Sequence, residues 1–134
     1  MLNMRKISFL AILILSTVFI SCTPDTPKEE EQALVINVDP DPGSTIAKAF
    51  GSTYTFKLVV TSKMPEQGVD VTVDFKKDLD NAVVFSQSLS TTTTATDITI
   101  NNLVFNEQGT VTVNVKSKTK ATNTAQKTFK LVRK

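Results

Sequence analysis

The sequence predicts an all-β fold, a single antiparallel β-sandwich domain of about seven strands behind an N-terminal segment of a different kind. Two observations predict it. From residue 33 onward, apolar and polar residues alternate with a period of two, and β-branched residues are frequent. No long run with helical periodicity interrupts these segments, and the connections between them have ordinary lengths.

The first two strands are expected between residues 33 and 61. One ends where Asp39-Pro40-Asp41-Pro42-Gly43 breaks the alternation, and the other covers residues 53–61. Their inward side chains are Leu34, Ile36 and Val38 in the first strand, and Phe56, Leu58 and Val60 in the second. The segment between them, 44–51, fits either a single helical turn or an edge strand.

The middle of the chain contains the clearest strand, residues 69–76. One face is apolar and the other polar, as an antiparallel sheet with one solvated side requires. The apolar positions are Val69, Val71, Val73 and Phe75. A polar loop over 77–81 leads to a strand over 82–89, with Val83, Phe85 and Leu89 expected in phase. A Ser/Thr-rich tract, 88–96, leads into the next segment, and within it the run 91–94 is expected to be a flexible or edge segment.

Three further segments complete the expected sandwich. Ile98 and Ile100 are followed, across a bend at Asn101-Asn102, by Leu103 and Phe105. The last two strands cover residues 110–116 and 125–133. Their inward side chains are Val111, Val113 and Val115 in the first, and Phe129 and Leu131 in the second. Short alternating strands in about 100 residues are typical of a sandwich.

Residues 107–113, Glu-Gln-Gly-Thr-Val-Thr-Val, resemble the acid-x-Gly-x-Tyr-x-Cys turn into the sixth strand of immunoglobulin domains. Val111 and Val113 stand where that family has tyrosine and cysteine, and the chain has no tryptophan. These departures argue against a true immunoglobulin domain. The chain is similar instead to fibronectin-III-like and related bacterial sandwich modules, over roughly residues 54–131. The resemblance implies an Ig-like architecture.

The first 21 residues have the order of a processed export signal. Arg5 and Lys6 form a basic start, and residues 7–20 form a charge-free apolar run. This run of about 14 residues is shorter than the roughly 20 that a helix needs to cross a bilayer. A cleaved signal is therefore favoured over the alternative of an uncleaved anchor.

Cys22, the only cysteine, directly follows the small residue Ser21. Phe19, Ile20, Ser21 and Cys22 resemble the lipobox of bacterial lipoproteins, in which Phe19 stands where leucine is usual and looser Bacteroidota-type lipoboxes are similar. This resemblance covers about the first 30 residues. It implies that residues 1–21 are removed, that Cys22 receives acyl chains such as palmitate, and that the protein is anchored to the outer membrane on either face. A secretory signal with an incidental Cys22 is the alternative.

Residues 22–32 are expected to be a disordered acidic tether, and residues 33–134 the domain. The tether has two prolines, several acids and no apolar periodicity. Within it, Lys28-Glu29-Glu30 resembles the Lys-acid-acid surface-export signal of Bacteroidota lipoproteins, although it lies farther from the cysteine. A solvated charged linker is the favoured interpretation.

The composition excludes most catalytic chemistry. The chain has no histidine, no thiol apart from Cys22, and no Gly-rich phosphate loop, so neither a Ser/His/Asp triad nor a Cys/His pair is available. All 13 acidic residues follow Cys22, whereas two of the 15 basic residues precede it, so side chains from residue 22 onward carry no net formal charge. We therefore expect no enzyme, no cofactor and no nucleic-acid partner.

Two pairs of aspartates have the spacing of calcium loops, Asp39 with Asp41 and Asp78 with Asp80. Neither continues into the glycine and distal glutamate of such a loop. Aspartate also favours turns, because its side chain bonds the local backbone. We therefore expect turns and no metal site.

The chain beyond Glu107 carries seven basic side chains and no acidic one. Lys116, Lys118 and Lys130 are the candidate members of a basic docking stripe on outward strand faces. The alternative is that exposed strand positions are polar in any case, and that edge lysines discourage aggregation.

The function expected is that of a non-catalytic, lipid-anchored structural or protein-interaction module of the cell envelope. A glycan-binding accessory lipoprotein is the alternative. It is disfavoured because the chain has one tyrosine and no tryptophan, and because Phe56, Phe75, Phe85 and Phe129 fall on inward phases.

Overall fold

The computed structural model describes residues 29–134, and within them the chain forms eight strands and no helix. This part of the chain therefore has no helix that is long and apolar enough to cross a membrane. The strands are β1 (Ile36–Asp39), β2 (Ile46–Ala49), β3 (Tyr54–Val60), β4 (Val69–Lys77), β5 (Val83–Thr91), β6 (Ala95–Ile100), β7 (Gln108–Ser117) and β8 (Thr124–Arg133). The segment 44–51, which fits a helical turn or an edge strand on sequence grounds, contains strand β2.

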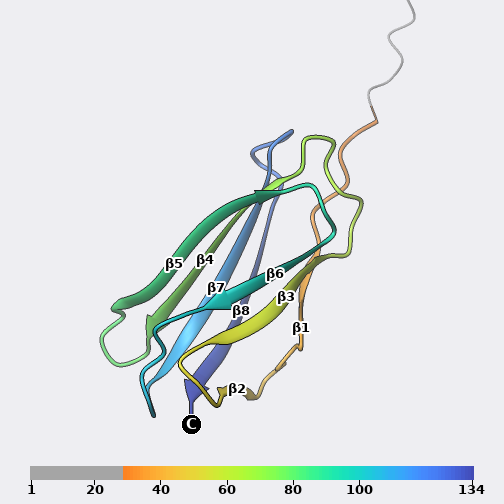
Figure 1. Cartoon of the computed structure of the whole chain (residues 1–134). Coiled ribbons are helices and arrows are strands. Elements are labelled where there is room, and N and C mark those ends of the chain that lie inside the picture. Colours follow the sequence, from red (N-terminus) through yellow and green to blue (C-terminus); the bar gives the residue numbers. More distant parts are fainter. Residues whose placement is uncertain (1–28) are drawn as a thin grey trace, which may run out of the picture.

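The strands form two sheets packed face to face (Figure 1). The smaller sheet has the order β1-β3-β6, and the larger has the order β2-β8-β7-β4-β5. In chain order, β1, β3 and β6 stand where immunoglobulin-like sandwiches have strands A, B and E, while β4, β7 and β8 stand where they have C, F and G. The fold is therefore the predicted all-β, Ig-like sandwich.

One pair of strands departs from the expected antiparallel arrangement. Strand β2 runs parallel to β8, with Ile46 opposite Lys130 and Ala49 opposite Arg133. The other pairings between these strands are antiparallel. The path of the chain is the cause, because after β1 it crosses to the larger sheet and keeps its direction, which is also the direction of β8.

The alternating apolar residues meet between the two sheets, as predicted. Side chains from both sheets are almost completely buried there, among them Phe56, Leu58, Ile98, Ile100, Val71, Val73, Phe75, Val111, Val113 and Leu131. Near the centre, the rings of Phe56 and Phe129 lie edge to face, with centroids 5.4 Å apart. Val111 and Val113 thus fill the core positions at which the immunoglobulin family has its tyrosine and cysteine.

Strand β5 follows its predicted phase only in part. Phe85 and Leu89 are half-buried against the core, as expected, but Val83 is 56% exposed. The pairing with β4 explains the difference, because Phe75 lies opposite Phe85 whereas the next residue, Lys76, lies opposite Val83. The extra residue on β5 makes a β-bulge, which reverses the phase of the strand at that point.

The entering chain is bonded to the domain from residue 29 onward. The side-chain amide of Asn123 donates to Glu31 (2.6 Å) and to the carbonyl of Gln32 (2.9 Å), and its oxygen accepts the Leu34 amide (2.8 Å). The buried Ser117 donates to the other oxygen of Glu31 (3.0 Å). Here the structure differs from the expected disordered tether, since polar contacts order residues 29–32 without any apolar periodicity.

Two ion pairs extend this attachment. Glu29 lies 3.1 Å from the Lys63 ammonium, and Glu30 lies 3.4 Å from the Lys120 ammonium. Both pairs are exposed, so each contributes little to stability. The expected signal peptide (1–21), the lipobox and Cys22 lie outside the described residues, as does the rest of the expected tether.

Candidate functional site

The end of the sandwich opposite the entering chain is unusually apolar. The loops 50–53, 78–82 and 101–107 and the C-terminus gather there (Figure 1). Of the seven large hydrophobic side chains that are exposed in the described chain, five lie on these loops or beside them: Phe50 (85% exposed), Leu79 (95%), Val83 (56%), Val104 (53%) and Phe105 (68%). We call these five residues the apolar end. Apolar patches that soluble domains leave exposed commonly mark interaction sites.

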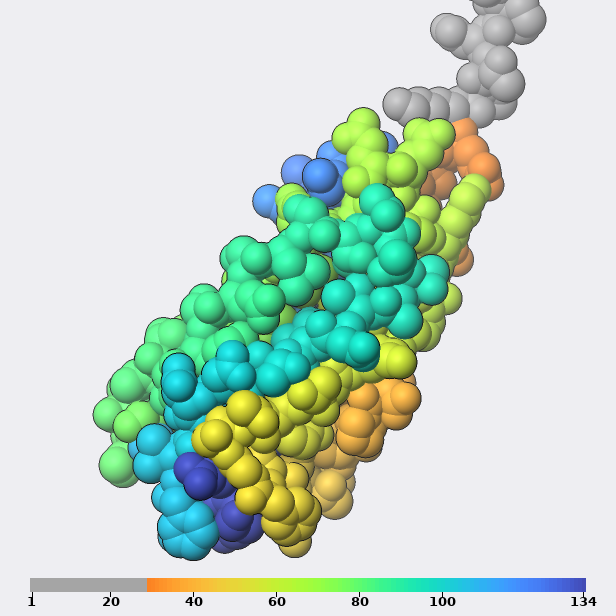
Figure 2. All heavy atoms as spheres, in the orientation of Figure 1, coloured from red at the N-terminus to blue at the C-terminus, as the bar shows by residue number. Residues whose placement is uncertain are grey.

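Backbone hydrogen bonds hold two of the loops against the end of β8. The bonds, donor first, are Leu103 to Ser52 (3.0 Å), Asn106 to Arg133 (2.8 Å) and Lys134 to Ala49 (2.8 Å). Phe105 also forms a bridge with Arg133. Phe50 and Phe105 therefore lie on either side of the last residues of β8, and Figure 2 shows both loops beside the C-terminal atoms at this end. Backbone hydrogen bonds therefore fix the two loops from which the exposed rings of Phe50 and Phe105 project.

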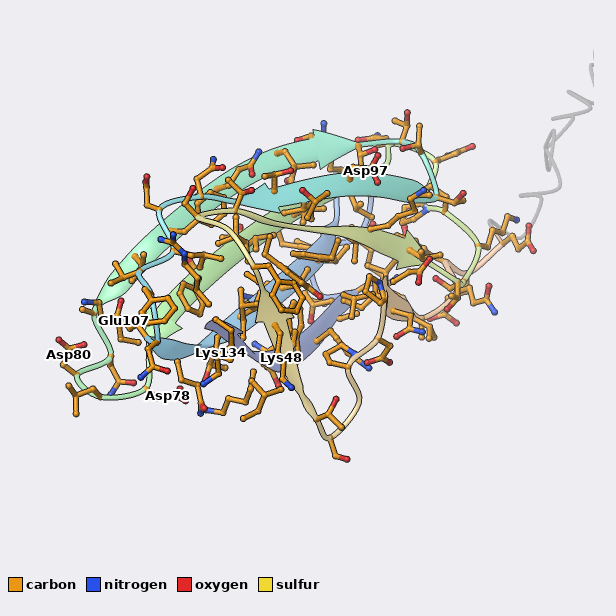
Figure 3. The ribbon with its side chains drawn as sticks, turned by 60° about the horizontal axis from the view of Figure 1, so that its bottom comes forward. Lys48, Asp78, Asp80, Asp97, Glu107 and Lys134 are labelled. Carbon is orange, nitrogen blue, oxygen red and sulfur yellow. The ribbon has the colours of Figure 1, made fainter. Side chains whose placement is uncertain are left out.

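Charged groups lie beside and between the exposed side chains of the apolar end. Lys77 and Glu107 form an ion pair of 2.7 Å, and the Glu107 carboxylate raises the pKa of Lys77. Figure 3 shows Glu107 with Asp78 and Asp80 on one side of this end, and Lys48 and Lys134 beside each other near its middle. The end thus combines exposed apolar side chains with charged groups of both signs beside and between them.

Asp78 ties the 78–82 loop to the larger sheet. Its carboxylate accepts hydrogen bonds from Lys130 (2.8 Å), Gln108 (2.9 Å) and Thr110 (2.7 Å). These three donors, Lys130 first, lower the pKa of Asp78 to about 2. The oxygens that a calcium ion would need are therefore already bonded to side chains of β7 and β8.

Two of the other aspartates considered for calcium, Asp41 and Asp80, bond the local backbone. Asp80 accepts the Ala82 amide (3.0 Å), and Asp41 accepts the Gly43 amide (2.9 Å). Asp41 also pairs with Lys127 at 2.9 Å, and this hydrogen bond lowers the pKa of Asp41. Within residues 29–134 no three Asp, Glu, Cys or His side chains converge in a way that would hold a metal ion. The contacts are those of turns.

The structure does not bring the three candidate stripe lysines together. Lys116 and Lys130 share the outer face of the larger sheet, but Lys116 lies opposite Thr124 and Lys130 opposite Thr110, six residues away along β7 or about 20 Å. Lys130 already forms an ion pair with Asp78. Lys118 follows the end of β7, at the other end of the molecule from Lys130. Their docking role stays a prediction.

A shallow depression lies on the same outer face, near the entering chain. Its volume is about 620 Å³, and most of its lining is polar: Asp70, Thr72, Asn114, Lys116, Thr124 and Gln126. These side chains come from the outward positions of β4, β7 and β8, which the alternation predicts to be polar. No aromatic residue is among those that line it.

Sequence reasoning placed four of the phenylalanines inward but missed the importance of Phe50 and Phe105. Both lie in loops, where period-two alternation gives no phase. The expected continuation of Ile98 and Ile100 through Leu103 and Phe105 is not a strand, because the chain between β6 and β7 is a loop in which Leu103 is buried and Phe105 is exposed. Phe50 had no assigned core position, and its ring is also exposed.

The fold and this surface define an Ig-like β-sandwich domain with an apolar loop end. No protein-family model matches the chain, and no curated protein matches it. Among solved structures, the chain is similar to the crystal structure of CopC from Methylosinus trichosporium OB3b, with 14% sequence identity, a TM-score of 0.49, and coverage of 77% of this chain and 93% of that chain. A likeness at this level carries no argument about what this chain binds.

Proposed function

We propose that the protein is a non-catalytic, lipid-anchored protein of the cell envelope that binds a partner protein through its apolar end. The observation that carries the proposal is the gathering of Phe50, Leu79, Val104 and Phe105 on loops that backbone bonds hold in place. A partner that covers these side chains gains the free energy of burying apolar area, and the fixed loops lose little entropy on binding.

The position of the apolar end supports this role. The anchor proposed at Cys22 precedes the chain that enters at the opposite end of the sandwich. Strands of nine or ten residues separate the two ends, which corresponds to about 30 Å. Attachment to the outer membrane, on either face, would leave the apolar end free for a partner.

A photoreactive amino acid placed at Phe105 tests the proposal in cells that naturally express the protein. We expect a discrete adduct with one protein at this position, and no adduct with the same group at Thr128, an exposed position on the outer face of β8. Adding Phe50→Ser should reduce the Phe105 adduct by roughly tenfold or more, as the loss of a central aromatic contact does. Equal adducts at both positions, or none at Phe105, would contradict the proposal.

Glycan binding remains the second candidate, and the polar depression favours it. Its amide and hydroxyl side chains, with Asp70 and Lys116, offer hydrogen-bond donors and acceptors to a sugar. A glycan array with the wild-type chain and with an Asn114→Ala/Gln126→Ala double variant tests this candidate. A saccharide signal that the double variant loses, and that Phe105→Ser keeps, would place glycan binding first. The absence of any saccharide signal would remove it.

A further inference from the structure

We propose that two copies of this chain pair edge to edge through β5, so that their larger sheets join into one continuous sheet across a two-fold axis. The proposal goes beyond partner binding at the apolar end and uses different residues, Phe85 to Thr91. Within residues 29–134, β5 pairs with β4 on one side only. Figure 1 shows its other side at the outer margin of the sheet.

The charges on the four edge strands single out β5. Strands β1, β2 and β6 are also edges, and they carry Asp39, Lys48 and Asp97 respectively. Strand β5 lies in the run 81–96, which contains no charged residue and no proline. Natural proteins commonly protect long edge strands with charges, prolines or bulges. The bulge on β5 is confined to its first residues, so the seven residues from Phe85 onward form an unprotected, regular edge.

A second copy fits this edge because identical neutral strands do not repel each other. Across a two-fold axis, each side chain meets the partner copy of itself or of a symmetric neighbour, and like charges directly opposite would be destabilising. The nearest acids, Asp70 and Asp74 on β4, each accept a hydrogen bond from a serine of β5, at 2.5 and 2.6 Å. Their charge is thus one strand away from the edge and already bonded.

The side chains of β5 indicate the register of the pairing. Phe85 and Leu89 point inward but are only half-buried, because the smaller sheet has three strands and does not fully cover β5. An antiparallel pairing centred on Gln87 places Phe85 of each copy opposite Leu89 of the other. Two aromatic–aliphatic cross-strand pairs then cover the exposed parts of these residues, and Ser86 of one copy meets Ser88 of the other.

Oxidative crosslinking of the full chain in isolated membranes tests the pairing. In a Gln87→Cys variant, the two new thiols face each other across the two-fold axis, so copper-phenanthroline should convert most of the protein to a disulfide-linked dimer. The matched control is Thr128→Cys, which places an exposed thiol in the middle of a paired strand. The parent chain, with Cys22 alone, controls for that cysteine. Adding Ser88→Lys to Gln87→Cys should abolish the dimer, because each lysine then faces Ser86 of the other copy and the two like charges lie diagonally across the axis, about 8 Å apart.

A Gln87→Cys dimer yield no higher than that of Thr128→Cys would overturn the proposal, as would a crosslink to a different protein only. Resistance to trypsin compared with the parent chain verifies that each variant is folded. If Gln87→Cys fails this check, light scattering of the parent chain in detergent decides the matter. A protein mass of two chains that falls to one chain in Ser88→Lys supports the pairing, and a single-chain mass at every concentration rejects it.

Discussion

Single polar side chains join segments of this protein that are far apart in the sequence. Asp78 links the loop that carries Leu79 to strands β7 and β8, through Gln108, Thr110 and Lys130. Its side chain is 28% exposed, so solvent weakens these contacts without removing them. Because the donors stabilise the charged form, Asp78 contributes to stability only while it is ionised.

The first prediction concerns this carboxylate and pH. The folded pKa of about 2 lies below the ordinary aspartate pKa of 3.8, so the contribution of Asp78 is complete above about pH 4 and disappears as the pH falls toward 2. After allowance for solvent screening it amounts to about 1 kcal/mol. Urea unfolding of wild type and Asp78→Asn should therefore differ at pH 6 and converge near pH 2. Asp97→Asn, whose carboxylate is 72% exposed, is the control and should match wild type throughout.

Asn123 performs a similar task at the other end, where it makes three hydrogen bonds to residues 31–34. We predict that Asn123→Ala lowers the free energy of unfolding by about 1–3 kcal/mol and speeds cleavage after Glu31 by a glutamate-specific protease. Asn114→Ala, which removes a single exposed bond to Gln126, is the control. Unchanged cleavage in Asn123→Ala would show that the segment is held by other contacts.

Strands with one face on the core and one in solvent were readable from the sequence, whereas the phase at the start of β5 and the partner of β2 were not. Strands β3, β4 and β7 alternate strictly, because each passes through the centre of the sandwich. The phase of Val83 was wrong because period-two counting cannot detect the extra residue of a bulge. The pairing of β2 with β8 could not be predicted for a different reason. The two strands lie more than 80 residues apart in the sequence, and the alternation within β2 does not indicate which strand it pairs with.

The candidate site was less predictable than the fold. The apolar end is made by loops, which bury no regular face and therefore leave no periodic trace in the sequence. Its two phenylalanines become neighbours of β8 only through long-range backbone bonds, such as Lys134 to Ala49. The three lysines of the expected stripe illustrate the opposite case. Their residue types suggested one surface, but strand length and the pairing of Lys130 with Asp78 keep them apart.

Two glycines give a prediction about the packing of β7 on β4. A side-chain carbon at Gly109 would meet the carbonyl oxygen of Lys76 and lie 2.5 and 2.7 Å from ring atoms of Phe75, whereas one at Gly51 would meet nothing within 4 Å. Gly109→Ala should therefore lower the free energy of unfolding by about 1–3 kcal/mol in urea titrations. Gly51→Ala should stay within about 0.5 kcal/mol of wild type. Equal effects would mean that β7 shifts to make room.

The folded domain, residues 29–134, is elongated and has two unlike ends, one that receives the chain and one that presents apolar side chains (Figure 1). The pairing proposed for β5 is antiparallel, so the two copies would place their entering chains at opposite ends of the joined sheet. Both chains reach the same bilayer if the strands lie along its surface. The apolar ends would then point away from each other, and each remains free to bind.

The last prediction concerns the anchor. Expressed in a lipidating bacterium, the protein should fractionate with membranes and have the mass of residues 22–134 plus acyl chains. Cys22→Ala should be soluble or retain residues 1–21, and should lack the acyl mass. Cys22→Ser, which keeps the size but not the thiol, should behave like Cys22→Ala. An unmodified wild-type product would refute lipid anchoring and would leave the apolar end as a property of a free exported domain.

The bonds that hold residues 29–32 to the domain also limit how far an anchored copy travels. Only residues 22–28 then separate the lipid from the folded domain, and seven residues span at most about 25 Å. Anchored copies would meet by two-dimensional diffusion along the membrane, within a layer only a few tens of ångströms deep. Such confinement raises their effective concentration. Even a weak β5 edge contact would then form at expression levels at which unanchored copies stay apart.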